Sequence, residues 1–541
     1  MKHYSKTLSS LLALLLSLAM LCSLTCFAAY AEASDRSDPE PAQTLRVQSE
    51  DWDDDEEDWD EDDEDDYGDD DEDDNGDTSD DGQRDTAPYT LNVKSGDDLE
   101  EALEEALSRH SHVIIPAGTY TCEYISLSGL GDTVLEAEGA TITGAYLGFG
   151  DSGKAVVKGG VWKDAYVGVR GASNVELRPE KLSIQGSEGS HGLLITGAEN
   201  LTLANITIEG AGDDGIFISS SKNITLINPT VKKSYFFGIA LRNGSTATIE
   251  GGLITTSGQR PRSAVSREDA KAGGLSVTEG SECTVYDATF SQNVACGVAV
   301  AGDSKSETST VNLYGVKLLD NGDHGVGGNP YAVVNLDKSK KQRSLAEGNA
   351  HNGVQVIDTS FSDFIRNTDF RKNGQDGLSI AKGSKVKLVE NCTMNNNKKH
   401  GVMIRHDSVV QKLNKCTMTG NKGYGILLNC EKGTAKTSAV ITNSKLNKND
   451  RDGIRLTGKK TSGSVKKCTL NGNKWSGLIV YDKSTLNEVS KTKATGNSRY
   501  GLGVYGKCTV KKASGNTFSG NKKRQVHVAS GGKSAEKATK K

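Results

Sequence analysis

The stretch Asn373–Ile380 (NGQDGLSI) recurs as Asn397–Ile404 (NKKHGVMI) and again as Asn421–Leu428 (NKGYGILL). Each copy begins with Asn and has Gly at its fifth position, followed by an aliphatic residue. The same Gly step continues in both directions at intervals of 23 or 24 residues, lengthened by 4 in three places and by about 12 in one. A fixed interval interrupted only by inserted loops is typical of a solenoid. Fourteen Gly residues mark the units: Gly168, Gly192, Gly215, Gly238, Gly274, Gly297, Gly325, Gly353, Gly377, Gly401, Gly425, Gly453, Gly477 and Gly501.

The pattern inside each unit indicates strands. The residue after the Gly is Val, Leu or Ile in all fourteen units, and the residue three after the Gly is apolar in twelve. This period of two is that of a strand. A pair of helices needs more residues per unit and a period of 3.6, whereas three short strands fit. We therefore predict an all-β fold, a solenoid of parallel strands.

An Asn stands four residues before the Gly in nine consecutive units, and one unit later Asn521 continues the series where Gln525 replaces the Gly. Identical amides can hydrogen-bond along a column when strands are stacked about 4.8 Å apart. We predict a structural ladder made of Asn293, Asn321, Asn349, Asn373, Asn397, Asn421, Asn449, Asn473, Asn497 and Asn521.

A helix is expected ahead of the coils. Asp97–Glu100 has the D-x-x-E pattern of a helix start. One apolar stripe follows, formed by Leu99, Ala102, Leu103, Ala106 and Leu107. Such a helix can cover the open end of the stack, where unpaired strand edges invite association.

Charge divides the chain sharply. Residues 50–85 hold 25 acidic residues and one Arg, whereas residues 301–541 hold 43 Lys and Arg and 18 acidic residues, a net of +25. The acidic run is too charged and too poor in apolar residues to form a core. We expect residues 32–87 to be a disordered, Asp/Glu-rich spacer and residues 531–541 to be a Lys-rich tail.

Residues 1–31 have the features of a signal peptide: Lys2 and Lys6 precede the apolar run Leu8–Phe27, which is followed by small residues. An uncleaved anchor is the alternative. We expect a secreted or cell-surface protein with no membrane span after signal cleavage.

The segment Ile114–Tyr120 (IIPAGTY), together with the coils from Val161 to Ser530, resembles the right-handed parallel β-helix of the pectate lyase and polygalacturonase superfamily. The resemblance implies about fifteen coils, with an N-terminal cap and first coils over residues 88–160 and repeats over 161–530. It also implies an acidic polysaccharide of the uronan or pectin type as substrate or ligand.

Candidate site residues come from the stretch Gly212–Ile218 (GDDGIFI), which resembles the G-D-D stretch of polygalacturonases. In that family two such aspartates and a third hydrolyse the glycosidic bond with inversion. His191 stands where the third aspartate is expected, and Asp376 and Asp452 also precede a repeat Gly. A structural role for Asp213 and Asp214 is therefore the alternative.

The longest interval adds a charged loop near Gln259–Lys271. Long loops on a rigid scaffold often carry function. In a lyase, Asp213 and Asp214 would hold Ca²⁺ on a uronate carboxylate while a basic residue takes the C5 proton. A tolerated surface insertion is the alternative. The charged residues of the loop are Arg260, Arg262, Arg267, Glu268, Asp269 and Lys271.

Two further rows are predicted to be mainly structural. One row lies before the repeat Gly and could alternatively form a sugar-stacking track: His324, Asp376, His400, Tyr424, Asp452 and Tyr500, with Trp475 one place earlier. The other row is Cys392, Cys416 and Cys468, which we expect to be free buried thiols rather than disulfides or zinc ligands.

The basic excess favours a polyanionic partner. Aromatic residues make up only 6% of the chain and no nucleic-acid module is present, so we expect an acidic polysaccharide or cell-wall polymer and no nucleic acid. Intramolecular neutralisation by the acidic spacer is the rival explanation. We expect a monomer with no certain cofactor. Two functions stay open: a polysaccharide lyase or polygalacturonase-like hydrolase, and a non-catalytic adhesin.

Overall fold

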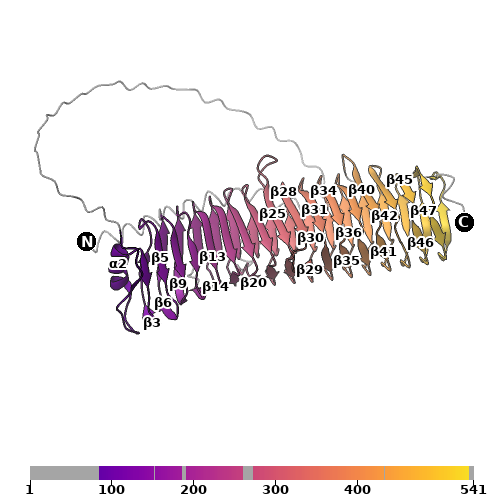
Figure 1. Ribbon diagram of the computed structural model, residues 1–541. Helices are drawn as coiled ribbons and strands as arrows, with labels where there is room; N and C mark the ends of the chain where they lie inside the picture. Colours follow the sequence, from indigo (N-terminus) through magenta and orange to yellow (C-terminus); the bar gives the residue numbers. More distant parts are fainter. Residues whose placement is uncertain (1–83, 151–152, 186–189, 260–271, 432, 535–541) are drawn as a thin grey trace, which may run out of the picture. The chain divides into compact units, whose positions relative to one another are not determined.

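The computed structural model describes residues 84–150, 153–185, 190–259, 272–431 and 433–534. From Asp85 onward these residues belong to one structural unit, a parallel β-helix of about 18 turns (Figure 1). The predicted fold class is therefore right, but about fifteen coils is too few, because strands from residue 112 onward already pair in register with the later coils. The predicted signal peptide, residues 535–541 of the predicted tail and all but the last four residues of the predicted acidic spacer lie outside the described residues.

Each complete coil contributes one strand to each of three parallel sheets. Sheet 1 contains β1 (Tyr89–Thr90), β2 (His112–Ile114), β5 (Thr133–Glu136), β8 (Ala155–Lys158), β10 (Glu176–Arg178), β13 (Glu199–Ala204), β16 (Lys222–Ile227), β19 (Thr246–Glu250), β22 (Glu282–Tyr286), β25 (Ser309–Tyr314), β28 (Ala332–Asp337), β31 (Phe361–Arg366), β34 (Lys385–Glu390), β37 (Val409–Asn414), β40 (Thr437–Thr442), β43 (Thr461–Lys466), β45 (Thr485–Ser490), β48 (Thr509–Val510), β49 (Ala513–Ser514) and β52 (Lys533–Ser534).

Sheet 2 contains β3 (Gly118–Thr121), β6 (Ala140–Thr143), the start of β9 (Val161–Arg170), β11 (Lys181–Gln185), β14 (Ile206–Glu209), β17 (Thr230–Lys232), β20 (Leu253–Thr255), β23 (Thr289–Ser291), β26 (Lys317–Leu319), β29 (Ser344–Glu347), β32 (Thr368–Arg371), β35 (Thr393–Asn395), β38 (Thr417–Thr419) and β41 (Lys445–Asn447), continued through a bridge at Thr469 by β46 (Lys493–Thr495) and β50 (Thr517–Ser519).

Sheet 3 contains β4 (Tyr124–Ser126), β7 (Tyr146–Gly150), the end of β9, β12 (Leu193–Thr196), β15 (Ile216–Ser219), β18 (Ile239–Arg242), β21 (Leu275–Val277), β24 (Val298–Val300), β27 (Val326–Gly328), β30 (Val354–Val356), β33 (Leu378–Ile380), β36 (Val402–Arg405), β39 (Ile426–Asn429), β42 (Ile454–Thr457), β44 (Leu478–Tyr481), β47 (Tyr500–Val504) and β51 (Arg524–Val528).

The core is a set of apolar columns. On sheet 3, Ile195, Ile218, Leu241 and Val277 are paired in register through four successive coils, and all four are fully buried. Burying each such side chain stabilises the fold by about 1.5 to 3 kcal/mol. The period of two in the sequence is therefore the alternation between this interior and the outer face of each sheet.

Two kinds of corner shape each coil. Sheet 1 passes to sheet 2 through a single residue in the left-handed conformation, such as Asn205 (φ 56°), Asn367 (φ 47°) or Asn391 (φ 52°). Asn tolerates this conformation better than most residues with a side chain. The corner from sheet 2 to sheet 3 is longer and contains the repeat Gly and the Asn column.

The ten asparagines form one buried column at this corner. Asn397 Oδ1 accepts hydrogen bonds from the backbone N and the Nδ2 of Asn373 at 3.1 and 3.0 Å. Its own Nδ2 donates to Phe370 O at 3.3 Å and to Asn421 Oδ1 at 3.0 Å. The same pattern joins every neighbouring pair from Asn293 to Asn521. Gln525 Oε1 accepts the last two N–H groups, from Asn521 N and Nδ2, at 3.1 and 2.9 Å.

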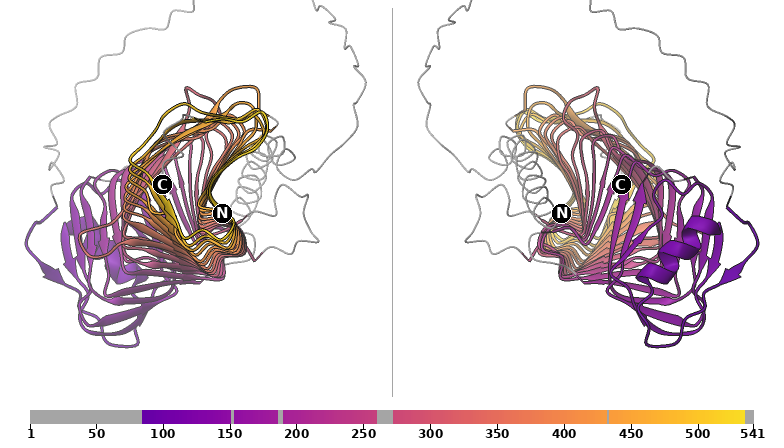
Figure 2. Two further views of the ribbon diagram at one scale, coloured as in Figure 1. Left: turned by 90° about the vertical axis from the view of Figure 1, so that its right-hand side faces the viewer. Right: turned by 90° about the vertical axis from the view of Figure 1, so that its left-hand side faces the viewer.

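Helix α2 (Glu100–Arg109) lies across the N-terminal end of the stack (Figure 2). Leu103 and Leu107 of this helix and its N-cap residue Leu99 are buried, as the apolar stripe predicts. The predicted D-x-x-E cap is not formed: Glu100 N donates to Asp98 Oδ1 at 2.9 Å, while Asp97 accepts from Lys94 N. In the described part of the chain, no helix has the length and apolar character needed to span a membrane.

Candidate functional site

His191, Asp213 and Asp214 meet at the corner between sheets 2 and 3, just before β12 and β15. His191 and Asp214 hold the same repeat position, each directly before a repeat Gly. Their coils are neighbours, because Leu193 pairs with Ile216. The repeat therefore brings His191 next to Asp213 and Asp214, which follow it by 22 and 23 positions in sequence.

The three side chains form a tight cluster. His191 Nδ1 lies 3.7 Å from Asp213 Oδ2 and 3.8 Å from Asp214 Oδ2, distances that are too long for hydrogen bonds. One ligand atom from each residue lies within 4.8 Å of the others. Asp214 Oδ1 accepts a hydrogen bond from Phe237 N at 2.8 Å. Asp214 is buried, whereas the side chains of His191 and Asp213 retain 14% and 15% exposure, so these two can meet a ligand.

The protonation of the cluster follows from its burial. Burial, and after it the charge of Asp213, raises the pKa of Asp214 to about 7, against the opposing effects of Arg242 and the Phe237 N–H. Burial also lowers the pKa of His191, an effect that Asp213 opposes and Arg242 reinforces. Near neutral pH the imidazole is therefore mainly neutral, and Asp214 is close to half protonated.

Two neighbours of the cluster are absent from the sequence prediction. The Phe217 ring stacks on the His191 ring with centroids 4.6 Å apart, and the Arg242 guanidinium lies 5.8 Å from the Phe217 centroid. Arg242 also lies 3.7 Å from Glu279 Oε1. Aligning the coils by their repeat Gly could have found both residues, because Phe217 and Arg242 occupy outward positions of successive sheet 3 strands.

The residue before the repeat Gly has a general structural role. Asp376 Oδ1 accepts the His400 N–H at 2.8 Å, and His400 Nδ1 accepts the Tyr424 N–H at 3.0 Å. Asp452 accepts from Ser476 N in the same way at 2.9 Å. These side chains join one coil to the next, and Asp214 Oδ1 does so too. The predicted structural role of this row is thus visible in its hydrogen bonds.

His191 differs from the other histidines at this position. His324 and His400 each accept a backbone N–H at Nδ1. Among the described residues, His191 Nδ1 has no hydrogen-bond partner and faces the two carboxylates. This nitrogen is buried, so it can exchange a proton with the two carboxyl groups or ligate a metal ion within the cluster.

Two groups of residues in the described ranges have the proximity needed to hold a metal ion. In the group Asp323, His324 and His351, His324 Nδ1 accepts the Asn352 N–H, so the proton of a neutral ring is on Nε2, the atom facing Asp323 at 3.3 Å. That nitrogen is a donor rather than a ligand. In the group His191, Asp213 and Asp214, the histidine Nδ1 accepts no backbone N–H and can act as a metal ligand. Its mixed nitrogen and oxygen donors differ from the all-oxygen set that Ca²⁺ prefers.

The predicted loop residues, including Arg267 and Lys271, lie outside the described residues. Gly258 and Gln259, the last described residues before this loop, lie at the corner between sheets 2 and 3 that also carries Asp213. Gly258 N and Gln259 N donate to Ser234 O at 2.9 and 3.2 Å, and Tyr235 N donates to Ala211 O in the coil that carries Asp213.

Near the C-terminus the same corner carries a row that we call the arginine ridge: Arg451, Trp475 and Arg499. The guanidinium carbons of Arg451 and Arg499 lie 5.2 and 4.5 Å from the Trp475 ring centroid. For Trp475 the sequence predicted a mainly structural role and left a sugar-stacking track as the alternative; in the structure the ring packs against two arginines.

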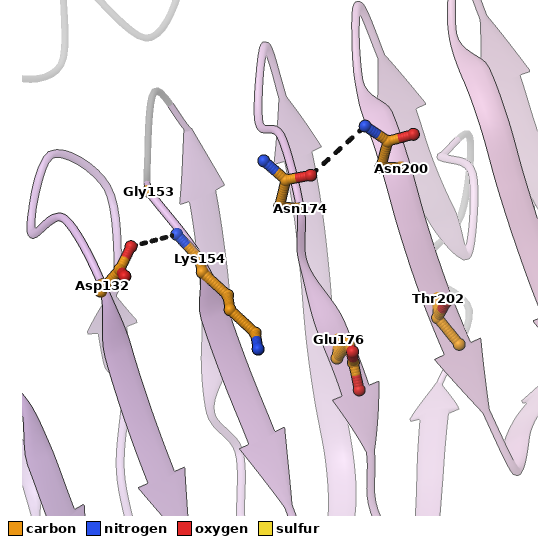
Figure 3. A pocket seen from close by; sticks show the side chains of 7 residues that line it. All are labelled: Asp132, Gly153, Lys154, Asn174, Glu176, Asn200 and Thr202. Carbon is orange, nitrogen blue, oxygen red and sulfur yellow. Dashed lines mark hydrogen bonds between the residues drawn. The ribbon is translucent and has the colours of Figure 1, made fainter.

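A polar pocket lies elsewhere, on the outer face of sheet 1 (Figure 3). Its side chains link neighbouring coils: Asp132 Oδ1 accepts the Lys154 N–H at 2.9 Å, and Asn200 Nδ2 donates to Asn174 Oδ1 at 3.3 Å. Because these side chains join neighbouring coils, we assign the pocket a structural role.

All eight cysteines beyond the predicted signal are described, and all are free and buried. Cys392 and Cys416 donate to backbone carbonyls of their own and neighbouring coils. Burial raises the pKa of the Cys122 and Cys468 thiols to about 11. Such thiols are unreactive.

Comparison with known proteins gives the family. A search of curated proteins finds no match. Similar solved structures include the periplasmic alginate epimerase AlgG (14% identity, 60% of this chain and 77% of that one, TM-score 0.39). They also include the Azotobacter vinelandii mannuronan C-5 epimerase AlgE4 A-module (13%, 82% and 99%, TM-score 0.27) and the catalytic unit of a GH87 α-1,3-glucanase from Streptomyces thermodiastaticus (11%, 82% and 70%, TM-score 0.27).

The family model for the right handed beta helix region matches residues 167–368, 274–410, 324–494 and 388–538. These overlapping matches span more than half of the 541 residues. The chain therefore belongs to the right-handed β-helix family.

Proposed function

We propose that this protein is a secreted carbohydrate-active β-helix protein that cleaves an acidic polysaccharide at the corner formed by His191, Asp213 and Asp214. The observation that supports this proposal most directly is the cluster itself. The imidazole of His191, whose Nδ1 makes no hydrogen bond, lies beside two carboxyl groups, and the pKa of one of them, Asp214, is raised to about 7. A base and an acid of this kind, at one place on a solenoid, suit proton-transfer chemistry.

The geometry favours elimination over hydrolysis with inversion. Inverting glycosidases hold their two carboxyl groups about 6.5 to 9.5 Å apart so that a water fits between them. The ligand oxygens of Asp213 and Asp214 lie within 4.8 Å of each other, which leaves too little room. A close carboxyl pair can instead share one proton and deliver it.

Each residue has a role in the proposed elimination. The Nε2 of His191 removes the proton at C5 of a uronate residue, while the buried Nδ1 faces the two carboxyl groups, and the electron pair forms the C4=C5 double bond as the C4–O glycosidic bond breaks. The leaving oxygen takes its proton from the Asp213–Asp214 pair through Asp213, the more exposed member. Arg242 supplies positive charge for the uronate carboxylate, whose neutralisation makes the C5 proton more acidic.

The same three residues could also support a metal-assisted elimination. His191 Nδ1 and the two carboxylates could hold a divalent cation, and a bound cation would add Lewis-acid polarisation of the uronate carboxylate. Ca²⁺ was expected for Asp213 and Asp214, but the imidazole nitrogen suits a transition metal better. Assays with and without Ca²⁺, and after chelation, separate these cases.

The test uses polygalacturonate, alginate and glycosaminoglycans, following reducing ends together with absorbance of an unsaturated product. We expect both signals to rise, and to fall at least about a hundredfold in His191→Ala and Asp213→Asn. Asp376→Asn is the matched control, because Asp376 has the same repeat position and a pKa raised to about 6 but is not in the cluster. Reducing ends without absorbance would mean hydrolysis and would contradict the elimination.

A non-catalytic adhesin is the second candidate. The observation that favours it is the arginine ridge, which needs no chemistry to bind an anionic glycan. Retained polysaccharide binding with no cleavage of any of the three polymers would support the adhesin over the enzyme.

A further inference from the structure

The arginine ridge is a continuous stack across three coils. Arg451, Trp475 and Arg499 each stand two residues before a repeat Gly. Trp475 N donates to Arg451 O at 3.4 Å, and Arg499 N donates to Trp475 O at 2.8 Å. The two arginines therefore approach the indole from the preceding coil and the following coil, and both are within the range of a cation–π contact of about 6 Å.

This arrangement decides what the ridge can bind. Because guanidinium groups approach the Trp475 ring from both neighbouring coils, the ring offers no open platform for a sugar or a nucleobase. The exposed feature is a pair of oriented positive charges. Arg451 is further held by Tyr424, whose OH accepts from Arg451 Nη1 at 3.2 Å.

The two arginines are not neutralised by nearby acids. Within the described ranges, neither Arg451 nor Arg499 has a carboxylate ion-pair partner, and both are exposed. Arg455 on the neighbouring strand is different, because it lies 3.4 Å from Asp452 Oδ2. Residues 451–534 carry 18 Lys and Arg and 3 acidic residues, a net of +15. The ridge thus lies in the positive part of the solenoid.

Guanidinium groups bind carboxylates through two parallel hydrogen bonds, a geometry that an ammonium group cannot reproduce. Aromatic contacts that fix the guanidinium before binding reduce the entropy lost on complex formation. Successive coils repeat about every 4.8 Å along the stack, so Arg451 and Arg499 lie about 10 Å apart in that direction. A polymer with regularly spaced carboxylates can meet both.

From these observations we infer that the arginine ridge is an anchoring surface that binds the carboxylates of an acidic polysaccharide chain running along the stack. The choice of polymer rests on the proposed function. The ridge is not part of the His191 corner, because nine coils separate Gly215 from Gly453, about 43 Å at 4.8 Å per coil. A single-stranded nucleic acid is the less suitable polyanion, since its binding relies on bases stacked against open aromatic faces.

The test measures binding of the full chain to immobilised polygalacturonate. The double variant Arg451→Gln/Arg499→Gln is compared with Lys385→Gln/Lys412→Gln, which removes the same charge from exposed positions on sheet 1. We expect the ridge variant to bind at least about tenfold more weakly and the control to change less than about twofold. Equal losses in the two variants would overturn the inference, and unchanged melting temperatures verify that both fold.

Two further arms test the chemistry. Arg451→Lys/Arg499→Lys keeps the charge but removes the planar fork, and we expect an affinity between those of wild type and the Gln variant. Carboxyl-reduced polygalacturonate should not bind, and oligo-dT should compete poorly. Wild-type affinity in the Lys variant, equal binding of the reduced polymer, or stronger binding of oligo-dT would each contradict a carboxylate-binding ridge.

The outcomes separate this inference from the proposed function. Loss of cleavage in His191→Ala with normal polymer binding leaves the ridge intact. Loss of binding in the Gln variant of the ridge, with normal turnover of short oligouronates, confirms the ridge as a surface distinct from the His191 corner. If no cleavage occurs but the ridge binds, the elimination fails while the inference stands.

Discussion

The Asn column predicts a large stability loss for a single polar-to-apolar change, Asn397→Leu. Asn397 is fully buried and makes four side-chain hydrogen bonds. Removing its Oδ1 leaves the backbone N–H and one Nδ2 hydrogen of Asn373 without acceptors. Each such orphaned buried donor costs about 1 to 3 kcal/mol, and the added apolar burial of Leu offsets about 1 kcal/mol. With two donors orphaned, we expect the free energy of unfolding to fall by about 1 to 5 kcal/mol.

The assay is urea unfolding followed by far-UV circular dichroism and by tryptophan fluorescence. The matched control is Gln525→Ala at the end of the same column. Gln525 accepts the same pair of N–H groups, from Asn521, but it is exposed, so water can replace its amide. We expect less than about 1 kcal/mol for this variant.

Two outcomes would refute this reasoning. Equal losses of unfolding free energy in Asn397→Leu and Gln525→Ala would mean that burial of the amide does not determine how much it stabilises the fold. An Asn397→Leu protein as stable as wild type would mean that the column contributes no net stability.

Three shorter predictions follow. Asp214 has a pKa of about 7 in the folded protein and of 3.8 in the unfolded chain, so its contribution to stability falls as the pH rises between these values. The stability advantage of Asp214→Asn over wild type should therefore grow from pH 4 to 7 and stay constant above pH 7, as measured by melting temperature. Burial lowers the pKa of His400 to about 4, so acidification from pH 6.5 to 4 should lower the stability of the fold through this residue. His400→Asn should lose less stability over this range, and the same pH dependence of stability in variant and wild type would contradict this role of His400. Because all eight described cysteines are free and buried, a reducing agent should leave the melting temperature unchanged, and a drop would reveal a disulfide.

Most of the fold follows from the sequence alone. The 24-residue Gly interval and the aliphatic residue after it fix a stack of strands, because only residues at the same repeat position can face the same interior column. The Asn positions likewise predict the column, since identical residues at one interval must lie one above another. The coil number was underestimated because the first coils, such as those of β2 and β5, lack the Gly and Asn signature.

The sequence also brings His191 next to Asp213 and Asp214, because a solenoid converts a one-unit separation into contact. Only the tertiary structure decides what these residues do. Whether His191 Nδ1 accepts a backbone N–H, as His324 and His400 do, depends on local ring orientation that no spacing encodes. The burial that raises the pKa of Asp214, and the two arginines that meet at Trp475, likewise depend on packing between coils, which exists only once the chain is wound.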